Sequence, residues 1–355
     1  MRLSEFLLFP FACMYGAATA FRNKMFDLGM KKSQAFDVPT LVVGNLAVGG
    51  TGKTPFIEFL LHQLANDYRL AVLSRGYGRK TRGFLVADDS TGPSEIGDEP
   101  SQVYQKFKER VRVAVGEERV LAIPMILATC GPVEAILLDD AYQHRYLAPD
   151  LRILLTTYGR PFFSDKLLPQ GRLRESRKNA NRADIVVVTK CPMPLSLQEE
   201  EWYRREIRRY AREGVPIYFS GLSYGEPYSI GPQSEALPRH LILVTGIVDP
   251  GPIVEELSKN HTVLEVMAFA DHHRYTMNDL RAIQQTCTNY RKYRPAVLTT
   301  EKDAVKLKDK AFQSVLAEIP VFVLPVAVTM DSRDRQQLLQ QVEQMITDKQ
   351  FDSEA

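Results

Sequence analysis

The chain has 355 residues, of which 45% are hydrophobic and 25% are charged. These are ordinary values for a globular protein, and the length predicts two domains. A formal net charge of +2 is too small for a protein that binds nucleic acid through bulk positive charge, so we expect no nucleic-acid partner. The four cysteines lack the spacing of a zinc site or a disulfide framework, which indicates a reducing compartment.

An uncharged apolar stretch covers residues 6–21. As a helix it would span about 24 Å, less than the roughly 30 Å of a bilayer core, and Pro10 weakens such a helix. We therefore predict that residues 1–32 form a membrane-associating segment that lies on or enters the surface without crossing it. A buried first helix and a signal peptide with Ala18-Thr19-Ala20 as its cleavage site are the alternatives.

After Pro39, short β-branched runs alternate with longer amphipathic stretches, which is typical of a parallel sheet covered by helices. Strands are predicted at residues 41–43, 70–73, 111–115, 135–138, 153–156, 185–189 and 217–219, and a second set at 241–245, 262–267, 296–299 and 321–325. Helices are clearest at residues 55–66, 199–212 and 333–348.

Residues 221–238 are rich in glycine and proline and show no periodic pattern, so we place a linker there. The predicted organisation is a larger domain at residues 33–220, this linker, and a smaller α/β domain at residues 239–355.

A glycine-rich turn between an apolar strand and a helix forms the sequence GNLAVGGTGKT at residues 44–54. Glycines let backbone N–H groups converge on phosphate oxygens, Lys53 reaches the β- and γ-phosphates, and the Thr54 hydroxyl can hold Mg²⁺. The predicted nucleotide-binding residues are Gly49, Gly50, Thr51, Gly52, Lys53 and Thr54. The fold class is therefore α/β, with a P-loop NTPase-type, mostly parallel sheet flanked by helices and a second, smaller α/β domain.

Acidic residues and histidines follow several predicted strands, where the ligand crevice of an open α/β sheet lies. Asp139 and Asp140 end one strand at the position of a Walker-B acid, and His144 follows them. Asp98 opens a helix, where capping alone would explain it. In the second domain the doublet His272-His273 follows Asp271, which favours acid–base chemistry over a zinc site.

Eight motifs in order resemble the tetraacyldisaccharide 4′-kinase family of lipid A biosynthesis: GNLAVGGTGKTP, SRGYGR, GDEP, LLDDAYQHR, LLPQGRLRE, VVVTK, FADHHRY and TEKDAVK. The resemblance covers nearly the whole chain. It implies ATP-dependent phosphorylation of the 4′-hydroxyl of a tetraacyldisaccharide 1-phosphate, giving lipid IVA, at the cytoplasmic face of the inner membrane. The implied partners are this glycolipid and the membrane surface, with no obligate protein partner.

The resemblance also implies residue roles. Asp98 would be the general base, assisted by His272 in preference to His273. Asp139 or Asp140 and Glu175 would hold or orient Mg²⁺ together with Thr54, which makes ATP and Mg²⁺ the implied cofactors. Lower-ranked contacts to the substrate or its surroundings are Gln143, His144, Arg119 and Arg172.

The sequence departs from the expected pattern at Ala47 and at Ala141. At position 141 glycine is usual, and a positive φ there would strain alanine. A P-loop GTPase or nucleotide switch is the alternative function, but the segment Val188-Thr-Lys-Cys191 lacks the aspartate of a guanine-binding NKxD turn. Because the predicted base and its histidine come from different domains, we expect domain closure to complete the site.

Overall fold

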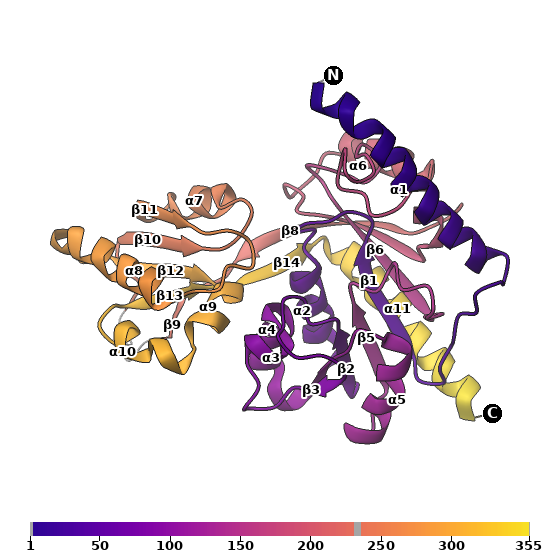
Figure 1. Cartoon of the computed structure of the whole chain (residues 1–355), viewed down its shortest axis with the longest axis horizontal. Helices are drawn as coiled ribbons and strands as arrows, with labels where there is room; N and C mark the ends of the chain where they lie inside the picture. Colours follow the sequence, from indigo (N-terminus) through magenta and orange to yellow (C-terminus); the bar gives the residue numbers. More distant parts are fainter. Residues whose placement is uncertain (1–2, 231–235, 355) are drawn as a thin grey trace.

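The computed structural model describes residues 3–230 and 236–354 and contains two α/β units, each built on its own sheet (Figure 1). The larger sheet has the strand order β14-β8-β7-β6-β1-β5-β2-β4-β3, and the smaller has the order β11-β10-β12-β13-β9. All pairs in the larger sheet are parallel except the edge pairs β14–β8 and β3–β4. The predicted fold class is confirmed.

Continuous apolar runs build the larger sheet because helices cover both of its faces. Its strands are β1 (Thr40–Asn45), β2 (Leu70–Ser74), β3 (Leu85–Val86), β4 (Val111–Val115), β5 (Ala135–Asp139), β6 (Leu151–Thr157), β7 (Ile185–Thr189), β8 (Ile217–Tyr224) and β14 (Val326–Met330). One face packs on α2 (Lys53–Leu64), α4 (Asp98–Phe107) and α11 (Ser332–Glu354), and the other on α5 (Arg119–Thr129) and α6 (Leu197–Arg208). A short helix, α3 (Pro93–Ile96), precedes α4.

The smaller sheet also has a core on each face. Its strands are β9 (Tyr228–Ser229), β10 (His240–Thr245), β11 (Thr262–Ala268), β12 (Ala296–Thr300) and β13 (Val321–Leu324). Its helices are α7 (Gly251–Leu257), α8 (Met277–Asn289), α9 (Glu301–Leu307) and α10 (Gln313–Leu316).

The connection between the units differs from the predicted linker at 221–238. Residues up to Tyr224 continue β8, and the chain returns to the larger sheet at β14, which pairs with β8 in antiparallel fashion. Helix α11 then packs Leu338, Val342 and Ile346 into the core of the larger unit. Residues 326–354 therefore belong with the first sheet, not with the second unit as 239–355 implied, and Figure 1 shows β8 and β14 spanning the gap together. Residues 231–235 lie outside the described residues.

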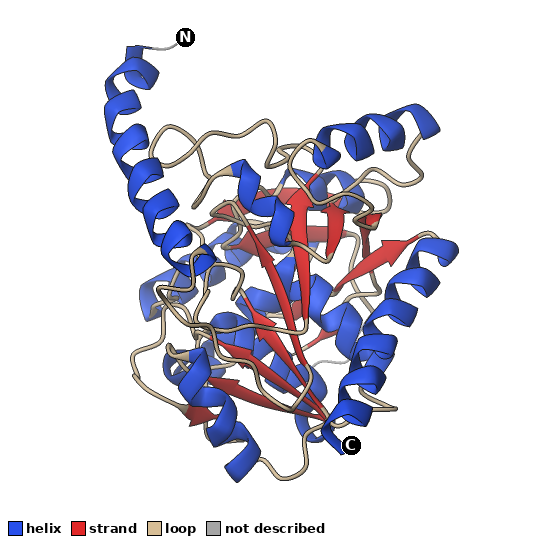
Figure 2. Cartoon of the chain, turned by 90° about the vertical axis from the view of Figure 1, so that its right-hand side faces the viewer, coloured by secondary structure: helices blue, strands red, loops and turns tan. Residues whose placement is uncertain are grey.

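The N-terminal segment is a single helix, α1 (Leu3–Asp27), which continues through Pro10. It lies along the outside of the larger unit (Figure 2). Its inner face buries Ala12, Asn23 and Phe26, so the alternative of a buried first helix describes only one side of it. Leu7, Phe11 and Met14 are each more than 60% exposed. Within residues 3–230 and 236–354, no helix combines the length and apolarity needed to cross a bilayer.

Candidate active site

The glycine-rich loop leads from β1 into α2 and is held from two sides. Gly52, the residue before α2, has φ 81°, a left-handed conformation that favours glycine. Thr189 Oγ1 on β7 donates a hydrogen bond to the carbonyl oxygen of Thr51 (2.8 Å), and Asn45 Nδ2 donates to Thr51 Oγ1 (2.7 Å). These contacts fix the loop, whose backbone N–H groups lie at a helix N-terminus and suit a phosphate group.

A second chain segment, residues 172–174, forms backbone hydrogen bonds with the same loop. Val48 N donates to Arg172 O (2.8 Å) and Arg174 N donates to Leu46 O (2.7 Å), while Ala47 bridges to Leu173. The Arg172 guanidinium would lie 3.5 Å from a Cβ atom at Gly49. The motif LLPQGRLRE, which contains Arg172 and Arg174, therefore adjoins the phosphate-binding loop, and Ala47 is accommodated there.

The two acids at the end of β5 face different partners. Asp140 accepts two hydrogen bonds from Arg174 (3.0 and 2.7 Å), and its Oδ1 lies 3.7 Å from Lys53 Nζ. Asp139 accepts from Ser74 Oγ (3.1 Å), and its Oδ1 is buried and has no hydrogen-bond partner within residues 3–230 and 236–354. Asp140, not Ala141, has positive φ (49°), so alanine at 141 is unstrained.

These environments shift the pKa values of the two carboxyl groups in opposite directions. Burial raises the pKa of Asp139 to about 7, and the negative charge of Glu99 acts in the same direction. Burial also acts to raise the pKa of Asp140, but the charge of Lys53 and the bonds from Arg174 outweigh it and hold the pKa low. The Asp140 carboxylate therefore balances the positive charges of Lys53 and Arg174. One oxygen of Asp139 has no hydrogen-bond partner within the described residues.

Arg119 and His144 lie next to these acids. Arg119 Nη1 donates to Gly116 O (2.8 Å) and Nη2 donates to Asp139 O (3.3 Å). Burial lowers the pKa of Arg119 to about 10, so it remains a cation at neutral pH. Burial and the charge of Arg119 lower the pKa of His144, whose Nε2 is buried without a partner in the described part of the chain.

Asp98 begins α4 beside the second unit. The preceding Gly97 has φ 92°, and a Cβ atom there would come within 2.8 Å of Tyr77 O. Only glycine fits, which fixes how α4 starts and where Asp98 lies. Burial acts to raise the pKa of Asp98, but the hydrogen bond with His272 and the charge of Lys306 outweigh it and lower the pKa.

His272 from the second unit contacts Asp98 directly. Its Nδ1 lies 3.3 Å from Asp98 Oδ2, and its Nε2 lies 3.3 Å from Lys302 Nζ. Because an ammonium group only donates, Nε2 accepts from Lys302, and this assigns the proton to Nδ1, which donates to Asp98. His272 has φ 58°, a strained conformation for a residue with a Cβ atom.

His273 points elsewhere. Its Nε2 lies 3.1 Å from Asp279 Oδ2, and its ring stacks on Phe269 within the second unit. The structure therefore brings Asp98 together with His272 and keeps His273 apart.

Glu175 is buried and takes part in a hydrogen-bond network. It accepts hydrogen bonds from Asn23 Nδ2 (2.9 Å) on α1, from Gln143 Nε2 (3.0 Å) and from Arg182. Gln143 Nε2 also donates to Asn45 O (2.8 Å). This network links the N-terminal helix to the base of the glycine loop.

Sequence reasoning missed two residues that form the site: Lys302 and Lys306 of α9 flank His272 and Asp98. Arg174, from the arginine-containing motif LLPQGRLRE, binds Asp140. Lys302 and Lys306 are four residues apart within the motif TEKDAVK, so they share one face of a helix. The spacing of these two lysines, in the segment after a predicted strand, is the sequence feature that could have identified them.

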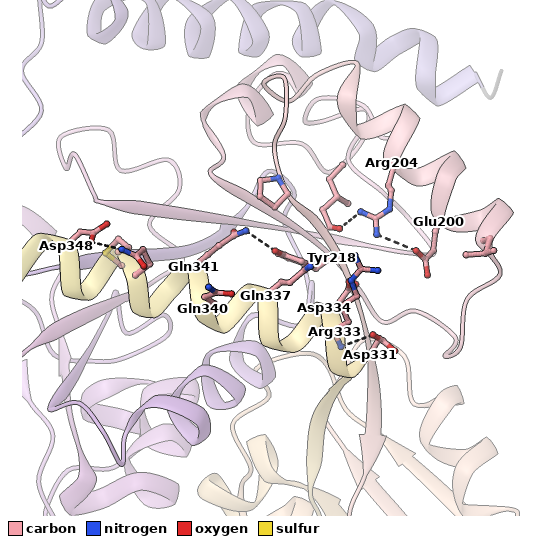
Figure 3. A pocket seen from close by; sticks show the side chains of 15 residues that line it. Glu200, Arg204, Tyr218, Asp331, Arg333, Asp334, Gln337, Gln340, Gln341 and Asp348 are labelled. Carbon is pink, nitrogen blue, oxygen red and sulfur yellow. Dashed lines mark hydrogen bonds and ion pairs between the residues drawn. The ribbon is translucent and has the colours of Figure 1, made fainter.

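A groove of about 1090 Å³ lies elsewhere, between α6 and α11 (Figure 3). Tyr218, Gln341, Arg204 and Glu200 line it, and Gln341 Nε2 donates to the Tyr218 hydroxyl (3.0 Å). None of the predicted site residues borders this groove.

The fold and the site together define a P-loop phosphotransferase, because the parallel sheet carries a glycine-rich loop of the phosphate-binding type between β1 and α2, and two units contribute an acid–histidine pair. The sequence model of the family "Tetraacyldisaccharide-1-P 4'-kinase" matches residues 4–346. This chain belongs to that family and is a kinase that phosphorylates a hydroxyl group.

Named relatives agree with this assignment. The tetraacyldisaccharide 4'-kinase of Flavobacterium johnsoniae is 44% identical over 326 residues, which cover 90% of this chain and 93% of the relative. That of Cytophaga hutchinsonii is 40% identical, with 97% of each chain covered. The crystal structure of LpxK from Aquifex aeolicus in complex with ATP superposes with a TM-score of 0.75 at 29% identity, covering 97% of this chain and 100% of that one.

Proposed function

We propose that this protein transfers the γ-phosphoryl group of ATP to the 4′-hydroxyl of a tetraacyldisaccharide 1-phosphate, with Asp98 as the general base. The observation that carries the proposal is the contact between Asp98 and His272 from opposite units. In phosphoryl transfer the protein mainly positions the groups and neutralises charge. Lys53, Arg119 and the glycine-loop amides supply the positive field, and the acid–histidine pair supplies the proton acceptor.

The proton path follows from the hydrogen bonds. Asp98 Oδ2 accepts from His272 Nδ1, which leaves Oδ1 to accept the hydroxyl proton of the sugar as its oxygen attacks phosphorus. Lys302 holds the ring through Nε2, and Lys306 Nζ, 3.6 Å from Asp98 Oδ2, keeps the carboxylate ionised. Protonation of Oδ1 gives a neutral carboxyl group whose Oδ2 still accepts the hydrogen bond from His272 Nδ1.

The residues present fit Mg²⁺, since Asp139 has a buried oxygen without a hydrogen-bond partner within the described residues, and the charge of Lys53, the residue before Thr54, acts on its carboxyl group. Mg²⁺ in such sites is held by one or two protein oxygens together with phosphate oxygens and water. Thr54 and Asp139 would hold it, with Asp140 as the counter-charge of Lys53. When bound, the ion would neutralise negative charge on the phosphates. For Glu175, predicted as a metal ligand, the bonds to Asn23 and Arg182 favour a role in positioning α1 instead.

The acyl chains of the proposed substrate indicate that the protein works at a membrane surface. The exposed face of α1, with Leu7, Phe11 and Met14, offers an apolar surface to the headgroup region of a bilayer. We place the enzyme peripherally on the cytoplasmic face of the inner membrane, where ATP is available.

The test is transfer of label from γ-labelled ATP to the disaccharide 1-phosphate in detergent micelles. An acceptor whose 4′-hydroxyl is blocked should take up no label. His272→Ala should reduce kcat by about 10²-fold or more, and His273→Ala, its sequence neighbour, should change kcat far less. Labelling of the blocked acceptor, or equal losses in the two variants, would contradict the proposal.

A further inference from the structure

Lys106, in the last turn of α4, bonds a carboxylate of each unit. Its Nζ donates to Glu58 Oε2 on α2 (2.7 Å) and to Glu301 Oε1 on α9 (2.8 Å). The side chains of Glu58 and Glu301 are only 2% and 9% exposed, so these contacts are shielded from water. An ion pair in such surroundings is stronger than one on the surface, and the loss of one partner leaves a buried charge unpaired.

Glu301 also contacts the connection between the units. It is the first residue of α9, and its second carboxylate oxygen, Oε2, accepts a hydrogen bond from Val326 N (3.2 Å). Val326 is the first residue of β14, the strand that returns the chain to the larger unit. Glu301 therefore joins Lys106 to the point where the chain passes from one unit to the other.

The same two helices carry the groups around Asp98. α4 has 10 residues, which is roughly 15 Å of helix, with Asp98 as its first residue and Lys106 in its last turn. On α9, Lys306 Nζ lies 3.6 Å from Asp98 Oδ2, and Lys302 Nζ lies 3.3 Å from His272 Nε2. The second unit therefore contacts both ends of α4. A shift of α9 that breaks the Lys106 pair also moves His272 relative to Asp98.

We propose that Lys106 is a positioning residue for the phosphoryl transfer: its pair with Glu301 holds the two units in the relative position in which His272 reaches Asp98. Lys106 acts through the placement of α4 and α9, not on the transferred phosphate. Glu58, in the same unit as Lys106, holds the ammonium group at the interface. The inference rests on the proposed roles of Asp98 and His272.

The test measures kcat and the KM for ATP of the full-length protein. Lys106→Met should lower kcat by about tenfold or more, since a misplacement of roughly 1 Å can cost about 10²-fold, and should leave the KM for ATP within about twofold. Lys106→Arg keeps the positive charge and should retain most of kcat. Lys108→Met is the matched control and should leave kcat unchanged, because Lys108 pairs with the exposed Asp89 of its own unit (3.3 Å).

Two further measurements separate positioning from a general loss of folding. Glu301→Gln changes the partner on the other unit with almost no change in shape, and it should lower kcat in the same direction as Lys106→Met. The radius of gyration from small-angle X-ray scattering reports how far apart the units lie. It should be larger in Lys106→Met than in the wild type and Lys106→Arg.

Wild-type kcat in both Lys106→Met and Glu301→Gln would overturn the inference. Equal losses of kcat in Lys106→Met and Lys106→Arg would overturn it too. In both cases a loss of kcat in His272→Ala would leave the proposed function standing. A wild-type protein that does not phosphorylate the disaccharide would overturn both.

Discussion

At the scale of single residues, the site depends on how neighbouring acids are given different surroundings. Asp139 and Asp140 are adjacent in sequence, yet Arg174 and Lys53 bind one while burial leaves an oxygen of the other free. Asp98 is kept ionised by contacts from the second unit. Adjacent or similar carboxylates can therefore take separate roles in one reaction.

Asp139 leads to a pH-dependent prediction. A carboxyl group must lose its proton to hold a cation, and burial raises the pKa of Asp139 to about 7. The thermal stabilisation that Mg²⁺ gives in the presence of ATP should therefore increase as the pH rises through about 7. In Asp139→Asn it should be small at every pH. A wild-type stabilisation that does not change with pH would argue against Asp139 as the ligand.

Local sequence was enough to predict the glycine loop and the acids at the end of β5, because each is a short pattern next to a strand. The roles of Asp98 and His272 came from the resemblance to a known family, since helix capping alone would explain Asp98. The choice between His272 and His273 depends on contacts across units, which local sequence does not contain. The same holds for Glu175, whose partners Asn23 and Arg182 come from separate segments. The family resemblance implied a metal ligand, but the fold turns Glu175 toward α1.

At the scale of elements, α1 has two different faces. Its inner side is tied to the site by Tyr15, whose hydroxyl donates to Arg174 O (2.8 Å), and by Asn23. Leu7, Phe11 and Met14 share its outer side, at the spacing of one helical face. The helix thus joins an apolar surface to residues that contact the glycine loop.

Phe11→Glu tests the role of this outer face. Removing one aromatic side chain from a lipid contact and adding a charge should weaken binding to anionic phospholipid vesicles by about tenfold or more. The melting temperature should be unchanged, because Phe11 is 61% exposed. Co-sedimentation with the vesicles measures the binding. Leu197→Glu on α6, at a residue that is 78% exposed, is the control. Equal vesicle binding by the wild type and Phe11→Glu would rule out this face as the contact.

Strands of the larger sheet were predictable because they are continuous apolar runs, whereas β14 was not. Residues 326–330 of β14 are half-buried or exposed, so they lack the pattern of a core strand, and their pairing with β8 joins positions about a hundred residues apart. Helix α11 was predicted from its periodicity, but which unit its apolar face would cover could not be known from local sequence.

The packing of α11 gives a stability prediction. Leu338 is fully buried in the core of the larger unit, so Leu338→Ala should lower the free energy of unfolding by about 2–5 kcal/mol. Gln336→Ala, two residues away and exposed, should change it by less than about 0.5 kcal/mol. Urea denaturation measures both. A loss in Leu338→Ala no larger than in Gln336→Ala would show that α11 does not stabilise this unit.

At the scale of the whole molecule, two units meet at the site and are joined by the paired strands β8 and β14. Two polar contacts between them are Lys106 on α4 with Glu301 on α9 (2.8 Å) and Asp98 with His272. Lys106 also bonds Glu58 on α2 of its own unit (2.7 Å). Burial raises the pKa of Glu58 to about 7, so this interface contains a carboxyl group that resists ionisation. The reacting groups come together only where these surfaces meet.

The most direct test of the account is a double-mutant cycle on kcat with Asp98→Asn, His272→Ala and the double variant, with ATP affinity measured in parallel. If the two residues act as one proton-accepting unit across the interface, each single change lowers kcat by about 10²–10⁴-fold, and the double change lowers it little further. ATP affinity should stay the same throughout. Independent, multiplying losses in the double variant, or full activity in Asp98→Asn, would contradict the account.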